Sequence, residues 1–328
     1  MSRQTRWGAR VAGALLTILG LAAALPAAAQ QYPSRPVRLI VPYPPGGAND
    51  TVARILAPGL SELLGQTLVV DNRGGGNTII GSELAARSAP DGYTLLMVAA
   101  GHALNPSLYP KLPFDAERDF TPVVLIGDGA YVLVAHPSSG ASTVAELITL
   151  AKAKPDQIAY ASSSIGNFTH LSAELFCSMA GVKMLHVPYK GGGPATLDLL
   201  AGRVAVFFSP VANARPHIQS NRIRALGVTT PKRSAALPTV PTIAEAGVPG
   251  YAASGWYGVV APAGTPKAIV DRLNTAFRTA MKPADIRERL VASGVEAADG
   301  TPAEFGRLIT TDIAKWAKIV KPLNIKME

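Results

Sequence analysis

Cysteine is almost absent from this sequence of 328 residues, which contains a single one, Cys177. A lone cysteine cannot form a disulfide within the chain, so no disulfide framework is expected. Cys177 lies in the apolar stretch HLSAELFCSMAG. This setting favours a small core residue over a nucleophile.

Long hydrophobic runs are also scarce, and the one that stands out lies at the N-terminus. Three arginines precede the apolar stretch 11–25, which is followed by PAAAQ. This order predicts a signal peptide over residues 1–29, cleaved after about Ala29. An uncleaved anchor is the alternative, but the run falls short of the ~20 residues that a membrane span needs. We therefore expect an exported, soluble protein that is located in the periplasm.

Blocks of basic residues are missing, although the formal net charge is +9. The three arginines of the predicted signal peptide account for three of these charges, which leaves +6 for the mature chain. The remaining lysines and arginines are dispersed, and no basic run contains interleaved aromatic residues. This distribution predicts a mildly basic, solvated surface and no binding of nucleic acid.

Nucleotide-binding motifs are absent from every glycine-rich loop. No G-x-x-x-x-G-K-[ST] sequence is present, which excludes a P-loop. The G-x-G-x-x-G pattern fails after Gly74 and Gly76, where Ile79 stands at the third glycine position. It fails again after Gly191 and Gly193, where Thr196 stands there. These loops are therefore not predicted to hold a nucleotide phosphate.

Metal-binding and catalytic patterns are equally scarce. The five histidines are far apart in the sequence and form no H-x-x-x-H pair, so no metal site is predicted. No G-x-S-x-G elbow is present. A serine of ASSSIGNFTH (161–170) with His170 as its base remains an alternative, although serines before a helix commonly act as caps. The sequence thus predicts a protein that is not an enzyme and has no cofactor.

Short apolar runs alternate with amphipathic segments along the rest of the chain, which predicts an α/β protein with mostly parallel sheets. About 299 residues follow the signal peptide, enough for two domains. A polar helical tail is expected to pack on the outside of one of them. Strands are predicted at 37–43, 67–72, 94–99, 123–127, 131–136, 158–163, 184–189, 204–209, 223–228 and 256–262, and helices from near Asp50, Gly81, Thr143, Thr169, Pro194, Thr242 and Pro266.

Four loops that follow predicted strands and precede predicted helices are rich in glycine or serine: 44–50, 72–77, 162–167 and 189–195. A helix start offers unpaired N–H groups and a partial positive charge. Glycine lets a ligand approach that backbone closely. In open α/β sheets ligands bind beyond the carboxyl ends of the strands. Together these features predict an anion-binding cleft, although each loop alone is also compatible with an ordinary turn.

Longer motifs strengthen this interpretation. RPVRLIVPYPPGGANDTVAR, APDGYTLLM, NPSLYPKLPFDAERDFTPV, HVPYKGGGPA, LPTVPTIAEAGVPGY and VVAPAGTPKAIVDRLN occur in this order. With them the mature chain resembles the Bug family, the extracytoplasmic solute receptors of tripartite tricarboxylate transporters. The resemblance implies a type II periplasmic-binding-protein fold, with two α/β lobes, a two-strand hinge and a small carboxylate in the cleft. It further implies delivery of the ligand to one large and one small membrane subunit.

On this resemblance, lobe 1 comprises residues 30–127 and 228–328, and lobe 2 comprises residues 128–227. The chain is expected to cross between the lobes near 125–133 and 225–230, and a monomer is expected. Family positions carried over to this sequence give the ligand-binding residues Tyr43, Gly46, Gly47, Asn49, Asp50, Gly101, His102 and Asn105 in lobe 1, and Ser162, Ser163, Ser164, Asn167, Thr169, Tyr189, Lys190, Gly191 and Ser209 in lobe 2. Ser209 stands where relatives often have Asp.

The loops expected to line the cleft also limit the ligand. Residues 98–106, 160–170, 186–196 and 207–213 contain no Asp or Glu. Burying an ammonium group without a partner is costly, so a receptor for amino acids is expected to supply an acid. We therefore expect a mono- or dicarboxylate without an amino group. A ligand sensor for a periplasmic signalling partner, and an exported serine hydrolase, are the two alternatives.

Overall fold

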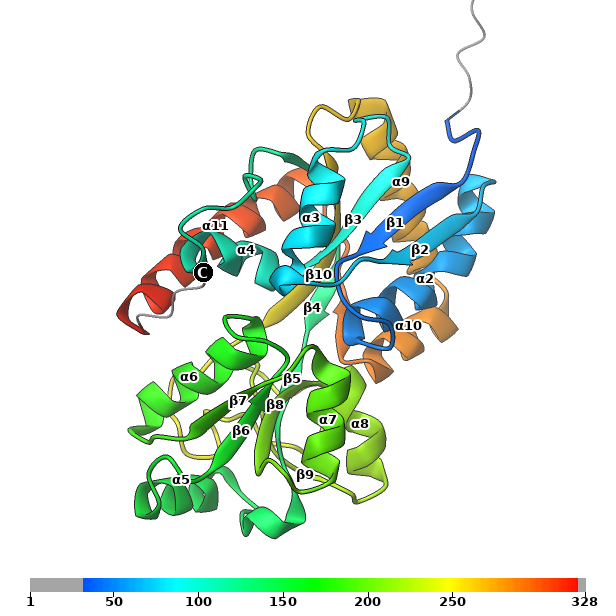
Figure 1. Ribbon diagram of the computed structural model, residues 1–328. Coiled ribbons are helices and arrows are strands. Elements are labelled where there is room, and N and C mark those ends of the chain that lie inside the picture. The colour runs from blue at the N-terminus through cyan, green and yellow to red at the C-terminus, as the bar shows by residue number, and fades with distance from the viewer. Residues whose placement is uncertain (1–31, 324–328) are drawn as a thin grey trace, which may run out of the picture.

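Two β-sheets, one in each of two lobes, organise residues 32–323, which are the residues that the computed structural model describes (Figure 1). The predicted signal peptide, residues 1–29, lies outside the described residues. Within residues 32–323, every helix is too short or too polar to span a membrane.

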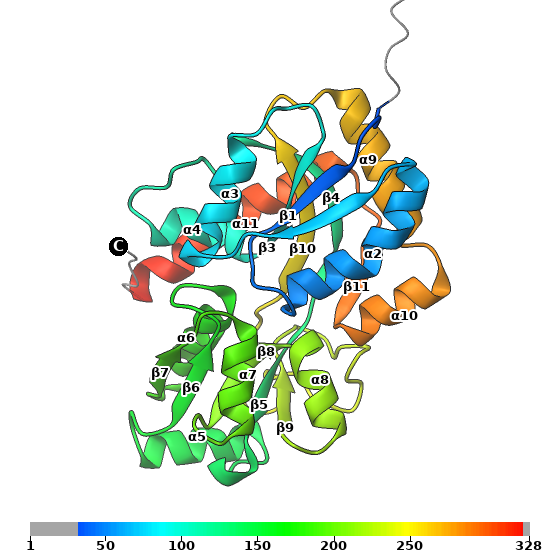
Figure 2. The same cartoon turned by 45° about the vertical axis from the view of Figure 1, so that its right-hand side comes forward.

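The first lobe contains a six-stranded sheet with the order β11-β4-β10-β3-β1-β2. In Figures 1 and 2, α2, α9 and α10 cover one face of this sheet, and α3, α4 and α11 cover the other. The strands are β1 (Val37–Val41), β2 (Leu68–Asn72), β3 (Thr94–Ala99), β4 (Phe120–Gly129), β10 (Gly255–Pro262) and β11 (Val295–Ala297). The helices are α2 (Ala48–Leu64), η1 (Gly76–Thr78), α3 (Ile79–Ala86), α4 (Gly101–Leu108), α9 (Lys267–Ala280), α10 (Ala284–Ala292) and α11 (Pro302–Leu323).

The second lobe contains a five-stranded sheet with the order β7-β6-β8-β5-β9. Helices α5 and α6 lie on one side of it, and α7 and α8 lie on the other (Figure 1). The strands are β5 (Tyr131–Ala135), β6 (Ala159–Ser162), β7 (Leu185–Pro188), β8 (Val206–Pro210) and β9 (Arg224–Val228). The helices are η2 (Pro137–Ser139), α5 (Val144–Ala153), α6 (Phe168–Ala180), α7 (Gly192–Leu200) and α8 (Val211–Gln219).

All ten predicted strands are present, but the prediction of mostly parallel sheets was wrong. β1 is parallel to β2 and β3, and β6 is parallel to β7 and β8. In contrast, β10 is antiparallel to both β3 and β4, and β5 is antiparallel to β8 and β9. The cause is the chain's path: β4 leaves the first lobe and β10 returns to it, so these neighbouring strands run in opposite directions.

Six of the seven predicted helix starts are confirmed, and the one near Thr242 was wrong. Thr242 and Glu245 cap one another, since each backbone N–H donates to the other's side chain. This capping box is a genuine helix signal. The chain nevertheless forms only turns there, because Gly247 has a φ of 132° and Pro249 follows two residues later. Helices α4 and α8 and strand β11 were not predicted.

The chain crosses between the lobes at the β4–β5 junction and again just before β10. The segment between β9 and β10 stays with the second lobe, because the Thr229 N–H donates to Tyr131 O (2.9 Å) and the Ala253 N–H donates to Thr229 O (2.8 Å). We therefore place the end of the second lobe near residue 254, later than the boundary at 228 predicted from the sequence.

The sequence suggested that the C-terminal helical segment packs against one lobe alone. Helix α11 instead packs against both lobes. It lies along α4 and β4 of the first lobe and reaches α6 of the second. Its Trp316 is 1% exposed, and its ring lies edge-on to Phe168, 5.6 Å between centroids. One turn earlier, Asp312 accepts a hydrogen bond from Trp256 Nε1 (2.6 Å). The C-terminal helix thus joins the hinge strand β10 to the start of α6.

Candidate ligand-binding cleft

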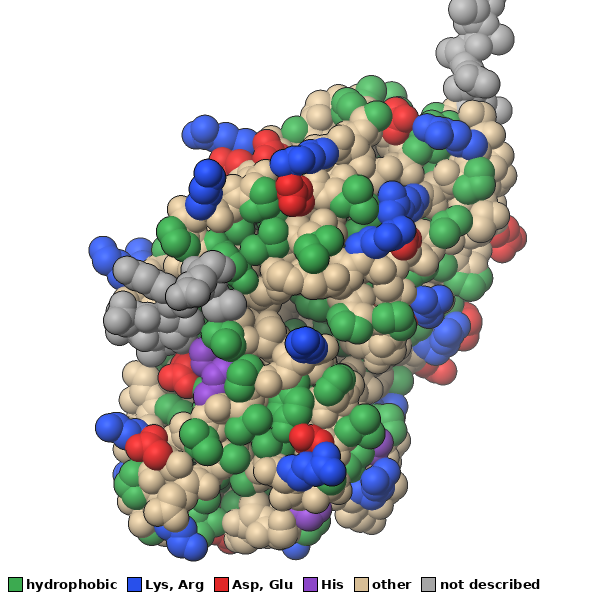
Figure 3. All heavy atoms as spheres, in the orientation of Figure 1, with side chains coloured by type: hydrophobic (Ala, Val, Ile, Leu, Met, Phe, Trp, Pro, Cys, Tyr) green, Lys and Arg blue, Asp and Glu red, His purple; other side chains and the backbone are tan. Residues whose placement is uncertain are grey.

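A cavity of about 710 Å³ lies between the two lobes, and Figure 3 shows the surface hollowed there. Its walls are the loops that follow the carboxyl ends of β1, β2, β3, β6, β7 and β8. This is where open α/β sheets bind ligands. Eight glycines and five prolines line it, so much of the wall is backbone or rigid ring.

Eleven of the seventeen predicted site residues line this cavity. They are Tyr43, Gly47, Asn49, Gly101, Ser163, Ser164, Asn167, Thr169, Tyr189, Lys190 and Gly191. The other six predicted residues lie beside the cavity and do not line it: Gly46, Asp50, His102, Asn105, Ser162 and Ser209. Their side chains or N–H groups make bonds within their own lobe.

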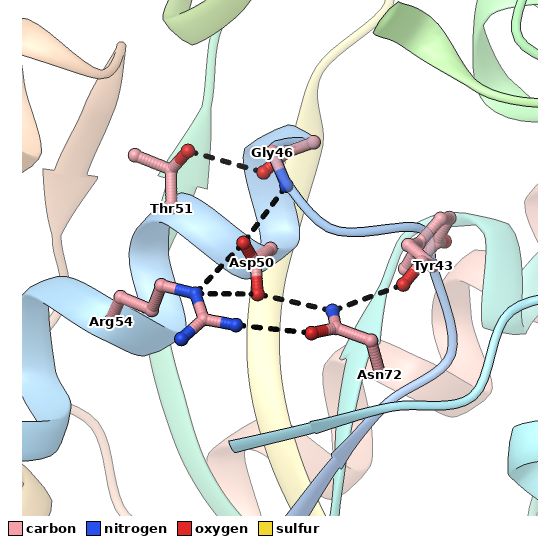
Figure 4. Close-up of polar contacts among 7 residues, drawn as sticks. Tyr43, Gly46, Asp50, Thr51, Arg54 and Asn72 are labelled. Atoms are coloured by element: carbon pink, nitrogen blue, oxygen red, sulfur yellow. Dashed lines mark hydrogen bonds and ion pairs between the residues drawn. The ribbon is translucent and has the colours of Figure 1, made fainter.

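Asp50 is bonded within the first lobe at the start of α2 (Figure 4). Its carboxylate accepts hydrogen bonds from the Gly46 N–H (2.9 Å), Arg54 Nε (2.9 Å) and Asn72 Nδ2 (3.0 Å). Burial alone would raise the pKa of Asp50, but these three donors together hold it below its usual value. The Gly46 N–H, which was expected to contact the ligand, is thus already paired with Asp50, and Gly46 does not line the cavity. Gly47 and Asn49 of this helix start do line the cavity.

His102 and Ser209 are likewise occupied by backbone partners. His102 Nε2 lies 2.7 Å from Ala116 O, and its ring stacks on Phe114. Burial lowers the pKa of His102 to about 4. The Ser209 hydroxyl donates to Pro210 O (3.1 Å) and is 1% exposed. Neither residue lines the cavity, so their contact with a ligand stays a prediction.

Ser162 meets a histidine, but not the one suggested from the sequence. Its Oγ lies 2.6 Å from His186 Nε2 and donates to Ser164 O (3.1 Å). His170 is unsuited to act as its base, because His170 Nδ1 accepts a hydrogen bond from the Gly166 N–H (3.0 Å). Ser162 is 0% exposed and does not line the cavity, so no substrate reaches its oxygen in this arrangement.

The second lobe presents the starts of α6 and α7 to the cavity. Asn167 caps α6 by accepting the His170 N–H (3.1 Å), and Thr169 Oγ1 donates to the same Asn167 oxygen (2.7 Å). The start of α7 has neither a side-chain cap nor an acid in its first turn. Lys190 stands just before it and is the only charged residue among the described residues that line the cavity.

Several lining residues were missed by the sequence prediction. The loop 72–77 was recognised as glycine-rich, yet Asn77 and its neighbour Thr78 were not assigned to the site. Tyr131 also lines the cavity, although as the first residue of a buried strand it carries no sequence signal of a site. Asn213 of α8 lies close to the α7 start, since a Cβ on Gly192 would be 2.8 Å from Asn213 Nδ2.

The family model described as the tripartite tricarboxylate transporter family receptor matches residues 52–325 of this chain. Among curated proteins, the chain is similar to Protein BugT of Bordetella pertussis. The two are 38% identical over 320 residues, which cover 97% of this chain and 98% of BugT.

Solved structures give the same result. The chain is 40% identical to R. palustris Rpa4515 with adipate (TM-score 0.86, covering 88% of this chain and 97% of that one). It is 33% identical to the periplasmic binding protein BugD (TM-score 0.86, 90% and 100%). It is 31% identical to MatC from Rhodopseudomonas palustris with bound malate (TM-score 0.83, 88% and 100%).

Proposed function

The chain belongs to the tripartite tricarboxylate transporter receptor family, and on this premise we propose that it is a periplasmic receptor for a small carboxylate without an amino group. The observation that carries the proposal is the charge of the cleft. Lys190 is the only charged residue among the described residues that line it, and no Asp or Glu does so. Such a cleft attracts an anion and offers no partner to an ammonium group.

The ligand class is supported by the two similar structures that hold adipate and malate. Both ligands are carboxylates without an amino group. A receptor of this kind would hold one carboxylate of its ligand near Lys190 and the start of α7, and the rest of the ligand among the neutral residues of the first lobe. The predicted export of the mature chain would bring the receptor to the periplasm.

A thermal-shift screen tests the binding step. A ligand present at about 100 times its dissociation constant adds ~2.7 kcal/mol to the free energy of unfolding and raises the melting temperature. We expect at least one acid from a panel of adipate, malate, succinate, citrate and benzoate to do so at pH 7. If every acid leaves the melting temperature unchanged, the proposed ligand class falls.

We further propose that the receptor acts as a monomer and delivers its ligand to one large and one small membrane subunit. The alternative partner is a periplasmic signalling protein. The two are separated by uptake of the radiolabelled ligand in a strain that lacks this receptor. Loss of uptake supports transport, whereas normal uptake with a lost transcriptional response supports sensing.

The exported serine hydrolase would use one of Ser162–Ser164, and we disfavour it. Ser162 is 0% exposed and lies off the cavity wall. Ser163 and Ser164 do line the cavity, but neither hydroxyl makes a hydrogen bond to a histidine within the described residues. We therefore propose that the protein catalyses no reaction. Incubation of the purified protein with p-nitrophenyl esters checks this directly. Hydrolysis that is abolished in Ser162→Ala, Ser163→Ala or Ser164→Ala would restore the enzyme alternative.

A further inference from the structure

Among the described residues, the contacts that join the lobes at the cavity include one hydrogen bond and one close backbone approach. The Ser164 hydroxyl of the second lobe donates to Asn77 Oδ1 of the first lobe at 2.8 Å. Near it, Gly191 approaches Pro44 so closely that a Cβ on Gly191 would lie 3.4 Å from Pro44 Cγ. All four residues line the cavity. The structure therefore describes an arrangement in which the lobes touch across the ligand site.

The backbone that carries Asn77 is unusual. Gly75, Gly76, Asn77 and Thr78 have consecutive positive φ angles of 127°, 54°, 50° and 79°. Glycine adopts this region freely and asparagine tolerates it, but a β-branched residue such as Thr78 is a true outlier there. Strain of this kind persists only where the surroundings hold it, and it concentrates at functional sites.

Asn105 of α4 holds this strained segment in place through hydrogen bonds. Its Nδ2 donates to Thr78 Oγ1 (3.1 Å) and, at the longer distance of 3.4 Å, to Asn77 O. Its Oδ1 accepts from Asn77 Nδ2 (3.3 Å). The residue is 1% exposed and does not line the cavity, although the sequence had assigned it to the ligand.

These bonds fix the orientation of both amide groups. A backbone carbonyl can only accept, so the Asn105 group that faces Asn77 O must be its nitrogen. The Asn105 oxygen then faces Asn77, and Asn77 must present its own nitrogen there. The remaining end of the Asn77 side chain, its oxygen, consequently points to the Ser164 hydroxyl.

We propose that Asn77 and Ser164 form a clasp that stabilises the closed arrangement of the lobes, and that Asn105 is a positioning residue that acts through Asn77. Hinged receptors close around their ligands, and apparent affinity falls when the closed form is less populated. The clasp rests on the proposed function only in that a bound carboxylate would favour the same closed form. The hydrogen bond itself requires no ligand.

Pulsed electron paramagnetic resonance on the mature chain measures closure directly. Nitroxides are attached at Leu84→Cys on α3 and Leu197→Cys on α7, which are exposed by 38% and 68% and lie in opposite lobes. Cys177→Ser removes the native thiol. The distance distribution is recorded without ligand and with adipate as the probe, and the affinity for adipate is measured by calorimetry.

Ser164→Ala should lower the ratio of closed to open molecules by about two- to tenfold, the range that one neutral hydrogen bond gives. Asn77→Ala should do the same, and the double variant should show no further loss, because both changes remove one bond. Asn105→Ala should lower the ratio in the wild-type background and have no effect in the Asn77→Ala background.

Ser163→Ala is the matched control, because it removes a hydroxyl from the same loop that makes no hydrogen bond to the first lobe within the described structure. It should leave the ligand-free distance distribution unchanged. Ser164→Ala leaves the strained loop itself intact, so it tests the clasp even where Asn77→Ala impairs folding.

The proposal is overturned if no closed component is detected in the wild type, or if Ser164→Ala leaves the closed fraction unchanged. Additive effects of Ser164→Ala and Asn77→Ala would also overturn it. If Ser164→Ala shifts the ligand-free distance distribution away from the closed form, but the wild type binds no carboxylate, the clasp is upheld and the proposed ligand is rejected. If Ser164→Ala leaves the distances unchanged and the wild type binds adipate, only the clasp is rejected.

Discussion

The two lobes present similar helix starts to the cleft, but these starts differ in charge. In the first lobe, α2 begins after Gly47, and the Asp50 carboxylate of its first turn accepts a hydrogen bond from the Gly46 N–H. In the second lobe, α7 begins after Gly191, has no acid in its first turn and is preceded by Lys190. One helix start thus carries its own anion, whereas the other has a cation beside it.

This difference teaches that a glycine-rich loop before a helix does not by itself define an anion site. The charges in and next to the first turn decide how strongly the helix start attracts an anion. We therefore expect the second lobe to attract the carboxylate. The first lobe would supply neutral wall residues, including Tyr43, Gly47 and Asn49. The predictions below test this division of roles.

The largest loss of ligand affinity is expected from adding a side chain to the neutral cavity wall of the first lobe. Gly47 has φ −77° and ψ 168°, which any residue can adopt, and a Cβ there would meet only Pro44 O, at 3.4 Å. Gly47→Val should therefore keep the fold and fill part of the cavity. We expect about 100-fold weaker binding of adipate, or about 2.8 kcal/mol, by calorimetry.

The control for this prediction is Gly300→Val, at a glycine that does not line the cavity. Circular dichroism should be unchanged in both variants. If Gly47→Val binds adipate as well as the wild type does, the start of α2 is an ordinary turn and the first lobe takes no part in recognition there.

The second prediction is that lowering the pH destabilises the protein, with buried histidines of both lobes contributing. Burial lowers the pKa of His102 in the first lobe to about 4 and that of His170 in the second to about 3, where the neighbouring His186 adds to the effect. Unfolded histidines titrate near 6.5. The unfolded chain therefore binds more protons below pH 6.5, and the stability present above that pH is lost as the pH falls toward 4.

Between pH 7 and pH 5.5, His102 and His170 together should reduce the free energy of unfolding by about 2 kcal/mol. His186, whose pKa burial lowers to about 4, acts in the same direction. Urea unfolding at several pH values measures this difference. Asp50 contributes in a lower window: its pKa is lowered in the folded protein, so its contribution is present above its unfolded value and disappears only as the pH falls through the folded one. A stability that is constant from pH 7 to 5.5 would contradict the neutral, buried state of the histidines.

A smaller effect is expected from removing the positive charge of the second lobe. Lys190 is exposed, so salt screens its attraction for a carboxylate. Lys190→Met should weaken adipate binding by about tenfold at low salt, or about 1.4 kcal/mol, and should reduce the dependence of affinity on salt. Lys183→Met, an exposed lysine away from the cavity, is the control. Equal losses in both variants would mean that net charge, and not the second-lobe site, attracts the ligand.

The sequence predicted the strands well because their β-branched runs are bounded by turn residues. It missed α4 and α8, which are short and contain Pro106 and Pro216, residues that usually end a helix. It also missed the antiparallel pairing of β10, since the direction of a strand depends on the chain crossing between lobes. No local pattern records that crossing.

The site was predicted at the level of loops and less well at the level of side chains. Asp50, Asn105 and Ser162 stand in or next to the correct loops, but each turns toward a partner in its own lobe. Asn77 was missed although its glycine-rich loop was singled out. Sequence patterns indicate which loops meet at the ends of strands, whereas the direction of each side chain depends on packing against distant residues such as Asn105.

The central claim is that the cleft accepts a carboxylate and offers no partner to an ammonium group. Calorimetry of the wild-type protein with matched pairs tests it most directly: succinate against aspartate, and adipate against 2-aminoadipate. Each pair differs by one amino group, so the difference in affinity reports the cost of burying that group. We predict that a deaminated acid binds and that its amino counterpart binds at least tenfold more weakly. Tight binding of an amino acid, with its deaminated analogue inert, would contradict the account.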